Sequence, residues 1–228
     1  MTALRVLNKA ILGCAKCPRL RAYCAQVARQ KRAAYRGEHY HGRPVPNFLP
    51  ARGRARLLVV GLAPGAHGAN RTGRMFTGDR SGDFLFRAMH DAGFANRATS
   101  LRADDGLSLH DAVITAACHC APPGNKPKPG ELANCAHWLE ETFDRPGNQL
   151  RVVICLGRLA FDSVCRLYRQ RGWLPRRSRS AFSHGAIHQV AGAPTLVCSY
   201  HPSQQNTFTG RLTPQMLAKV FRAARVLC

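Results

Sequence analysis

Acidic residues and long apolar runs are what this sequence has least of. Only 12 of its 228 residues are Asp or Glu, whereas 34 are Lys or Arg, so the formal net charge is +22. No apolar run approaches the roughly 20 residues that a membrane-spanning helix needs, and the N-terminus lacks the long apolar core of a secretory signal. These absences exclude a membrane protein and predict a soluble protein of the cytoplasm. A hydrophobic content of 45% excludes a disordered chain.

The basic charge is concentrated at the two ends of the chain. Residues 1–60 and residues 145–228 each carry 13 basic residues and one acid, which is a net charge of +12 for each segment. Residues 61–144 carry 8 basic and 10 acidic residues. Clustered Lys and Arg bind polyanions because contacts with phosphates release counterions. The distribution therefore predicts a nucleic-acid partner.

Short apolar runs alternate with amphipathic stretches along the chain. The runs are bounded by Gly and Pro and predict four buried strands, at residues 56–62, 111–116, 150–156 and 194–200. The amphipathic stretches predict helices at 4–12, 18–32, 81–93, 129–143, 158–169 and 213–227. Alternating strands and helices favour a parallel sheet that is covered on both faces. We therefore expect a single α/β domain, a three-layer α/β/α sandwich with a central, four-stranded, mainly parallel sheet.

The chain has ten cysteines, and disulfides are rare in the cytoplasm. Cys14 and Cys17 form a Cys-x-x-Cys pair, and Cys120 and Cys135 lie in polar, turn-rich surroundings. Four thiolates can hold one metal centre, and the wide second gap suits an iron–sulfur cluster better than zinc, which stays the alternative. Cys118 precedes Cys120 by two residues and could compete as a ligand. The remaining cysteines are expected to fill space: Cys24, Cys155, Cys165, Cys198 and Cys228.

Two polar loops follow predicted strands. Five of the nineteen residues in GLAPGAHGANRTGRMFTGD (61–79) are glycine, so the backbone of this loop can approach a ligand closely. Neither the Walker pattern nor Gly-x-Gly-x-x-Gly is present, which excludes the usual nucleotide cradles. The loop offers Phe76 and Asp79, and the second loop, SYHPSQQNTFTGR (199–211), offers His201. Because both loops leave carboxyl ends of strands, they can face each other across one crevice.

These motifs together resemble the iron–sulfur members of the uracil-DNA glycosylase superfamily, most closely family 5 (type b). The loop 61–79 is similar to the first motif of that family, SYHPSQQNTFTGRLTP to its second, and ITAACHCAPPGNKPKP to its cluster-binding stretch. The resemblance implies a monofunctional DNA N-glycosylase, a repair hydrolase that flips uracil and other deaminated or damaged bases out of double-stranded DNA. It further implies a monomer associated with the nucleoid. A [4Fe-4S] cluster would lie in a lobe built from residues 14–17 and 118–135.

The sister family 4 differs from this sequence at two positions. It carries a Glu where this chain has Leu62, and an Asn four residues before the third cysteine, where this chain has Ala116. In relatives that have it, the Asn reads the Watson–Crick edge of uracil. Both departures are typical of family 5 and imply a broader range of bases.

Within the resemblance, three side chains are expected to carry the chemistry. His201 would donate a hydrogen bond to the base oxygen as negative charge develops on the base. Asp79 would orient water or stabilise the sugar cation, unless it only caps the helix that starts near Ser81. Asn125 would contact the base or the water, or else form a turn. The base itself would stack on Phe76, whose alternative is a core aromatic, and bind main-chain N–H groups of Leu62, Ala63 and Gly65.

The remaining expectations concern DNA contacts. Phe208 and Arg211 are predicted to form a wedge that fills the hole left by the flipped base, with ordinary loop packing as the alternative for Phe208. Phosphate contacts are predicted for Arg71, Ser203, His184 and His188, although both histidines could equally be surface residues. Neither motif contains a Lys, so no Schiff-base lyase step is expected. The competing function is a non-catalytic iron–sulfur or zinc protein that binds nucleic acid or senses redox state.

Overall fold

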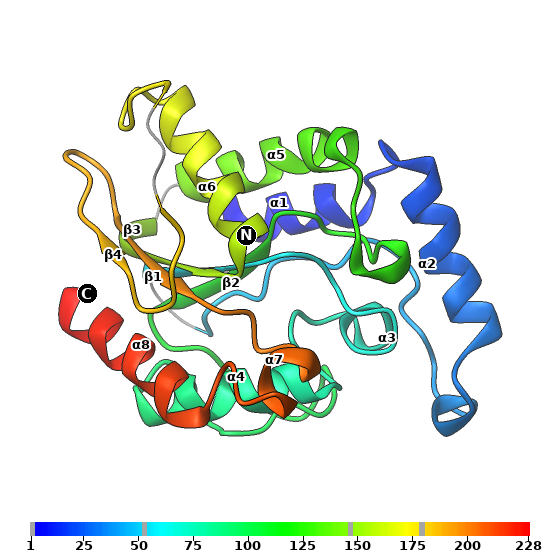
Figure 1. Ribbon diagram of the computed structural model, residues 1–228. Coiled ribbons are helices and arrows are strands. Elements are labelled where there is room, and N and C mark those ends of the chain that lie inside the picture. The colour runs from blue at the N-terminus through cyan, green and yellow to red at the C-terminus, as the bar shows by residue number, and fades with distance from the viewer. Residues whose placement is uncertain (1–2, 52–53, 146–147, 178–180) are drawn as a thin grey trace.

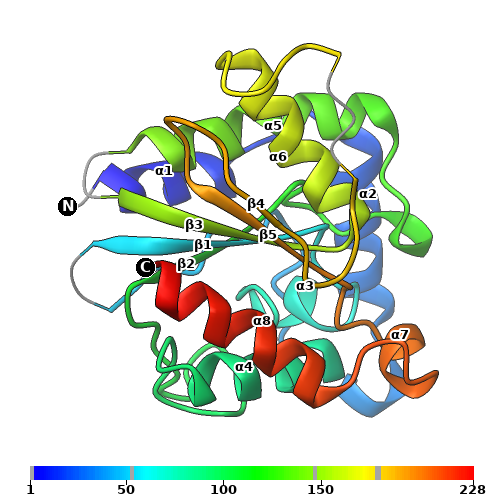
Figure 2. The same cartoon turned by 60° about the vertical axis from the view of Figure 1, so that its left-hand side comes forward.

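A computed structural model describes residues 3–51, 54–145, 148–177 and 181–228. Its centre is a sheet of five strands, which are β1 (Ala55–Gly61), β2 (Ala112–Ala116), β3 (Asn148–Leu156), β4 (Ile187–His188) and β5 (Thr195–Ser199). The strand order is β2-β1-β3-β5-β4, and all pairs are parallel except β4 with β5. Both faces of the sheet are covered by helices (Figures 1 and 2), so the predicted mainly parallel α/β/α sandwich is confirmed.

The two faces of the sheet build two separate hydrophobic cores. Helices α4 (Arg80–Asp91) and α8 (Pro214–Leu227) pack on one face, where alternate strand residues such as Leu57 and Val59 point. Helices α1 (Ala3–Leu12), α5 (Pro129–Asp144) and α6 (Arg158–Gln170) cover the other face, where Leu58 and Val60 point. Because successive strand side chains alternate between faces, a strand buried on both sides is a continuous apolar run, as each predicted strand is.

A third cluster of buried side chains lies beyond the carboxyl ends of the strands, where helix α2 (Pro18–Gln30) is found (Figure 1). It contains five cysteines together with Leu20 and Ala121. This cluster is smaller than the two cores beside the sheet, and it forms the hydrophobic interior of the predicted lobe. Two short helices, α3 (Ala69–Thr72) and α7 (Gln204–Phe208), interrupt the two polar loops.

Local signals place the ends of the longer helices close to their predicted positions. Asp79 caps α4 and Thr213 caps α8, each accepting a hydrogen bond from a backbone N–H in the first turn. The sequence did not predict α3, α7 or β4, which have four, five and two residues. Elements this short depend on tertiary contacts because they cannot show a hydrophobic period.

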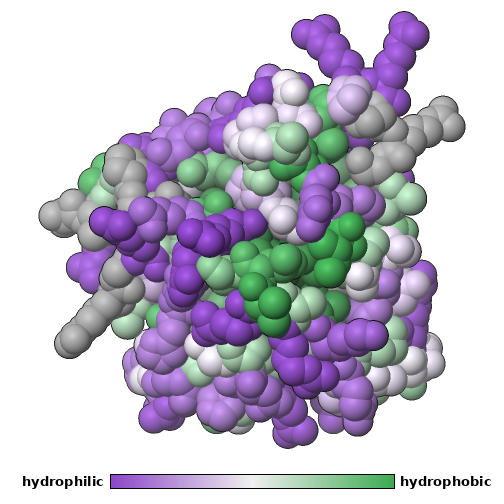
Figure 3. Space-filling view, turned by 90° about the vertical axis from the view of Figure 1, so that its left-hand side faces the viewer, coloured by the Kyte–Doolittle hydropathy of each residue, from purple (hydrophilic) through white to green (hydrophobic). Residues whose placement is uncertain are grey.

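The surface reflects the low content of acidic residues and the abundance of Arg. On the face that Figure 3 shows, hydrophilic side chains surround an apolar patch. Large apolar side chains are exposed at a few positions, and Phe208 is the exposed aromatic among them, with 67% of its surface accessible. Within the described part of the chain, no helix is both long enough and apolar enough to span a bilayer.

Candidate active site

A cavity of about 590 Å³ lies where the loops leave β1, β2 and β5. The loop after β1 contributes Leu62, Ala63, Gly65, Phe76 and Asp79, all of which were predicted to be site residues. The turn after β2 contributes Asn125, and the loop after β5 contributes His201 and Ser203. The two polar loops therefore do face each other across one crevice, because parallel strands bring their carboxyl ends to the same edge.

Asp79 has two structural partners in this cavity. Its Oδ1 accepts a hydrogen bond from the Gly82 N–H at 3.1 Å, which caps α4. Its Oδ2 lies against the glycine loop so closely that a Cβ on Gly68 would be only 1.9 Å away, and one on Gly65 would be 3.0 Å away. Burial raises the pKa of Asp79 above the value of a free carboxyl group. One oxygen therefore caps the helix and the other borders the cavity.

Phe76 and His201 pack beside each other in the wall of the cavity. Their ring centroids are 5.8 Å apart, and the rings are inclined by 31°. Phe76 has a φ of 52°, a conformation that is rare for a non-glycine residue. Its ring edge covers Gly61, where a Cβ would lie 2.8 Å from the ring, so only glycine fits at the end of β1. The strained backbone and the glycine together turn the ring toward the cavity.

His201 lies at the carboxyl end of β5 and is held from both sides. Asn206 donates a hydrogen bond from Nδ2 to the His201 carbonyl at 2.8 Å, and the His201 Cβ lies against Gly157. Loss of hydration lowers the pKa of His201 to about 4, so the imidazole is neutral at pH 7. No carboxylate among the described residues is paired with this imidazole. A neutral imidazole of this kind is a hydrogen-bond donor of the type expected for a developing oxyanion.

Asn125 belongs to a turn that borders both this cavity and a neighbouring hollow of about 490 Å³. The hollow is lined on its far side by Tyr23, Arg32 and Tyr35 from the region of α2, and by His67 from the loop after β1. The sequence reasoning missed these residues. The interleaving of Tyr and Arg between residues 23 and 35 is the signal that could have found them, since nucleic-acid sites combine aromatic and basic side chains.

The predicted phosphate contact at Arg71 does not match its position. Arg71 is only 5% exposed, and its guanidinium donates to Glu38 and to the carbonyls of His67 and Gly78 at 2.8 and 2.7 Å. It also lies over the ring of Tyr35. An Arg in this position orders the loop after β1, because its donors are used inside the protein.

Two histidines also lie away from the cavity. His184 accepts the Tyr200 N–H at 3.2 Å through Nδ1 and packs beside the Tyr200 ring. His188 is on β4, and its ring packs against Phe161 with a centroid distance of 5.6 Å. Both positions suit packing at the sheet edge better than a phosphate contact. Ser203 lines the cavity, but its hydroxyl caps α7 by accepting the Asn206 N–H.

The predicted wedge residues lie at the C-terminal end of α7 and just after it. Phe208 ends this helix, and the Arg80 guanidinium lies 5.0 Å from its ring. Arg211 lies over the ring of Tyr200 at 4.6 Å. These cation–π contacts set the direction of each side chain. Phe208 is exposed, as a side chain that enters a duplex must be.

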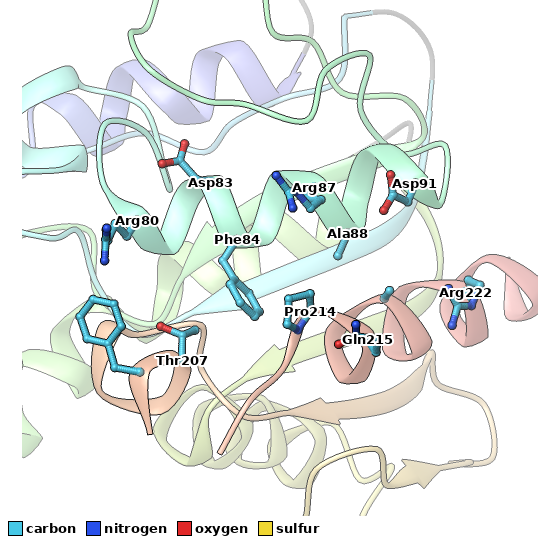
Figure 4. A pocket seen from close by; sticks show the side chains of 12 residues that line it. Arg80, Asp83, Phe84, Arg87, Ala88, Asp91, Thr207, Pro214, Gln215 and Arg222 are labelled. Atoms are coloured by element: carbon cyan, nitrogen blue, oxygen red, sulfur yellow. The ribbon is translucent and has the colours of Figure 1, made fainter. Parts of the chain in front are cut away.

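A groove of about 590 Å³ runs from Phe208 between α4 and α8 (Figure 4). Its walls carry Arg80, Arg87 and Arg222, and its floor contains Phe84 and other apolar residues. Among the described residues, Arg87 and Arg222 have no ion pair, and both are exposed. Asp83 and Asp91 also line the groove, so its three Arg side chains leave only a weakly basic surface beside the predicted wedge.

The four predicted metal ligands gather at the α2 lobe. Cys17, Cys120 and Cys135 are buried in the third hydrophobic cluster, and Cys14 lies close enough to Cys17 to affect its thiolate. Thiolate donors of this kind suit iron or zinc, so the donor set fits the expected cofactor. Among the described side chains, however, no three Cys, His, Asp or Glu are placed so as to hold one metal ion. The third hydrophobic cluster also contains Cys24 and Cys118, which were not among the four predicted metal ligands.

The fold and the cavity together define a protein of the α/β/α sandwich class whose site lies at the carboxyl ends of parallel strands. A model of the uracil DNA glycosylase superfamily matches residues 46–225. The chain belongs to this superfamily, as its motifs predicted.

The similar proteins are called type-5 uracil-DNA glycosylases. The protein of Mycobacterium leprae is 47% identical over 221 residues, which are 97% of this chain and 94% of that protein. The protein of Thermus thermophilus is 46% identical over 95% of this chain and 94% of its own length. The protein of Pyrobaculum aerophilum is 43% identical, with 94% and 88% covered. The predicted resemblance to family 5 is therefore confirmed.

Proposed function

We propose that this chain is a monofunctional DNA glycosylase that hydrolyses the N-glycosidic bond of uracil and of other deaminated or damaged bases in double-stranded DNA. The observation that carries the proposal is the meeting of Asp79, Phe76 and His201 in one cavity, in a chain that belongs to the uracil DNA glycosylase superfamily. The glycosidic bond is hidden in a duplex, so the base must be flipped at a cost of a few kcal/mol of unstacking.

The flipped base would lie in the cavity against Phe76. Cleavage leaves negative charge on the base and positive charge on the sugar. His201 donates a hydrogen bond to the base oxygen from the N–H group of its neutral imidazole. Main-chain N–H groups near Leu62 and Ala63, which line the same cavity, would supply further donors.

Asp79 acts on the sugar side of the reaction. Its carboxylate stabilises the sugar cation and orients a water molecule whose oxygen bonds to the sugar carbon as the bond to the base breaks. The proton lost by the water passes to the carboxylate and then to solvent, and the departing base takes up a proton. No Lys lines the cavity among the described residues. The proposal accordingly contains hydrolysis alone, without a covalent imine.

The cavity is large for uracil, with a volume of about 590 Å³. Ala116 and Leu62 line it with apolar atoms where polar side chains would select one base edge. These features support the wider range of substrate bases.

We assign the [4Fe-4S] cluster to Cys14, Cys17, Cys120 and Cys135, in a lobe of the single domain. Held by these four thiolates, a cluster would cross-link the α1–α2 turn to α5 and to the loop after β2. It has no part in hydrolysis, because the described cavity contains no cysteine. Substituting Cys17 by alanine should destabilise the lobe. We further propose that the protein acts as a monomer in the cytoplasm, at the nucleoid.

The test of the proposed function is a base-release panel. Duplexes that contain uracil, hypoxanthine, xanthine or ethenocytosine opposite each normal base are incubated with the protein, and free base is quantified. Release of uracil and at least one other damaged base is expected. Release of none of them, by a folded protein that binds the duplexes, would favour the non-catalytic binding protein instead.

The pH profile of kcat/KM should have an acidic limb that belongs to Asp79. Burial raises the pKa of this carboxyl group, so the reactive carboxylate is lost as the pH falls through a value above that of a free Asp. The profile should therefore be flat near neutrality and fall with unit slope on the acid side. The residual activity of Asp79→Asn should lack this limb. A limb that persists in Asp79→Asn would assign it to another group.

The groove between α4 and α8 should contribute to the grip on duplex DNA. Each phosphate contact adds about 0.9 to the slope of log K against log salt. The double substitution Arg87→Gln with Arg222→Gln should lower that slope by about 2 and weaken binding equally for damaged and undamaged duplexes. The matched control is Arg5→Gln with Arg166→Gln, which removes the same charge from α1 and α6 across the sheet. Equal effects of both pairs would mean that net charge alone acts.

A further inference from the structure

The hollow beside the active-site cavity has no part in the proposed hydrolysis. Its volume is about 490 Å³, and it shares Gly65, Asp79 and Asn125 with the cavity, so the two spaces adjoin at the Asp79 carboxylate. Among the described residues that line it, the charged ones are Arg32, Arg80 and Asp79, which leaves an excess of positive charge. A nucleotide whose sugar lies at Asp79 continues into the strand through a phosphodiester on each side. The hollow is therefore placed to receive one of these phosphates.

Arg32 is the cation of this hollow that is free to bind an anion. Its side chain is exposed, and within the described ranges of the chain it has no ion pair. Arg80 differs, because its guanidinium lies 5.0 Å from the ring of Phe208. The backbone of Arg32 is held between the end of α2 and a short 3-10 helix that begins at Ala33. A guanidinium in such a position suits the bidentate binding of a phosphate.

Tyr40 holds His67 next to Arg32. The Tyr40 hydroxyl lies 3.0 Å from Nδ1 of His67 and accepts the Arg32 N–H at 3.4 Å. Because the hydroxyl accepts the Arg32 N–H, its own proton is available to Nδ1, and a neutral His67 ring then carries its proton on Nε2. Loss of hydration lowers the pKa of His67, so the ring is neutral at pH 7. His67 lines the hollow, and Nε2 is the ring nitrogen left to donate to a ligand.

The loop after β1 adds backbone donors to the same wall. Ala66 and His67 both line the hollow. In the described part of the chain, neither of their N–H groups donates to a backbone carbonyl. Successive N–H groups of this kind can bind an anion. A guanidinium, an imidazole and backbone N–H groups thus line one hollow, and these are the donors that proteins use for DNA phosphates.

We propose that this hollow is a subsite for a phosphodiester that flanks the target nucleotide on the damaged strand, and that Arg32 and His67 bind it. The proposed subsite rests on the proposed function, since its ligand is the strand that carries the target base. Flipping turns a nucleotide about its backbone. A phosphate held beside Asp79 would therefore keep the extruded nucleotide in place, through contacts that lie outside the base cavity.

The test replaces single phosphates of the damaged strand by uncharged methylphosphonates and measures binding to the full-length protein. The duplexes carry a 2′-fluorinated deoxyuridine, because the fluorine destabilises the sugar cation and so slows cleavage. In wild type, the methylphosphonate on one side of the target nucleotide should weaken binding by about tenfold, as the loss of a charged hydrogen bond does. Arg32→Gln and His67→Asn should each weaken binding of the unmodified duplex by about tenfold. In both variants the same methylphosphonate should then cost less than about threefold, because its partner is already gone.

The matched control is Arg29→Gln, which removes an exposed Arg from the last turn of α2, outside the hollow. It should keep the full methylphosphonate effect. Equal methylphosphonate effects at both flanking phosphates in wild type, Arg32→Gln and His67→Asn would overturn the subsite. Thermal unfolding of each variant separates a lost contact from a lost fold.

Release of uracil from unfluorinated duplexes is measured alongside binding and separates the two proposals. If wild type releases uracil but the effects are equal in all variants, the subsite alone is overturned. If wild type releases no base, the proposed hydrolysis is overturned, and the binding data still decide whether Arg32 and His67 hold a phosphate.

Discussion

Replacing Gly68 by alanine is expected to lower base release by about 10²- to 10⁴-fold, the range that a positioned acid or base contributes. The added Cβ would lie 1.9 Å from Oδ2 of Asp79, so the carboxylate must leave its place. Gly68 has φ −99° and ψ −104°, a combination outside the regions that residues with a Cβ readily adopt, so backbone strain adds to the steric effect. Single-turnover release of uracil from a duplex measures it. Duplex binding should be nearly unchanged.

The matched control is Gly130→Ala, because a Cβ at Gly130 meets no atom within 4 Å. Asp79→Asn then separates the two roles of this residue. Asn caps helices about as well as Asp, so thermal stability should be kept while release falls as far as in Gly68→Ala. If Asp79→Asn releases uracil at the wild-type rate, Asp79 is a helix cap only.

Replacing His201 by leucine is expected to lower base release by about 10²- to 10³-fold, as the loss of one donor to a developing oxyanion does elsewhere. Leucine keeps the apolar bulk beside Phe76 but removes the N–H group. His201→Asn restores a donor on a shorter side chain and should recover part of the rate. The measurement is single-turnover release with saturating enzyme, alongside duplex binding.

The outcome that contradicts the role of His201 is an equal loss of release and of duplex binding. A residue that only shapes the loop after β5 would give that result. The loop is held independently by the hydrogen bond from Asn206 to the His201 carbonyl, which the side-chain substitution leaves in place. His201→Leu should therefore melt at nearly the wild-type temperature.

Long, periodic elements could be predicted from the sequence. The strand β1 is a continuous apolar run bounded by charged residues and glycine, and α4 begins at Asp79 as a capped helix should. Short elements could not be predicted, since α3 and α7 depend on contacts across the loops. The two-residue strand β4 exists only because β5 offers an edge to pair with.

The candidate site, like the fold, was predicted only in part. Asp79, Phe76, Asn125 and His201 were predicted from their loops, and the structure brings all four to one cavity. Arg71 was assigned to a DNA phosphate because a basic residue in a polar loop is usually exposed. The sequence alone does not show which distant residues a loop arginine contacts. Glu38, more than thirty residues away in the chain, meets its guanidinium and keeps it inside the protein. His184 and His188 were assigned to phosphates for the same reason, and instead pack at the sheet edge.

The sequence by itself determined the fold class, the family and the residue types of the site. These depend on local periodicity, on charge, and on motifs that are contiguous in the chain. Only the tertiary structure decided which side chains are free to act. Burial and hydrogen-bond partners come from residues distant in the chain, and they distinguish the buried Arg71 from the exposed Arg87. For the same reason, only the structure places Cys118 in one buried cluster with Cys17, Cys120 and Cys135.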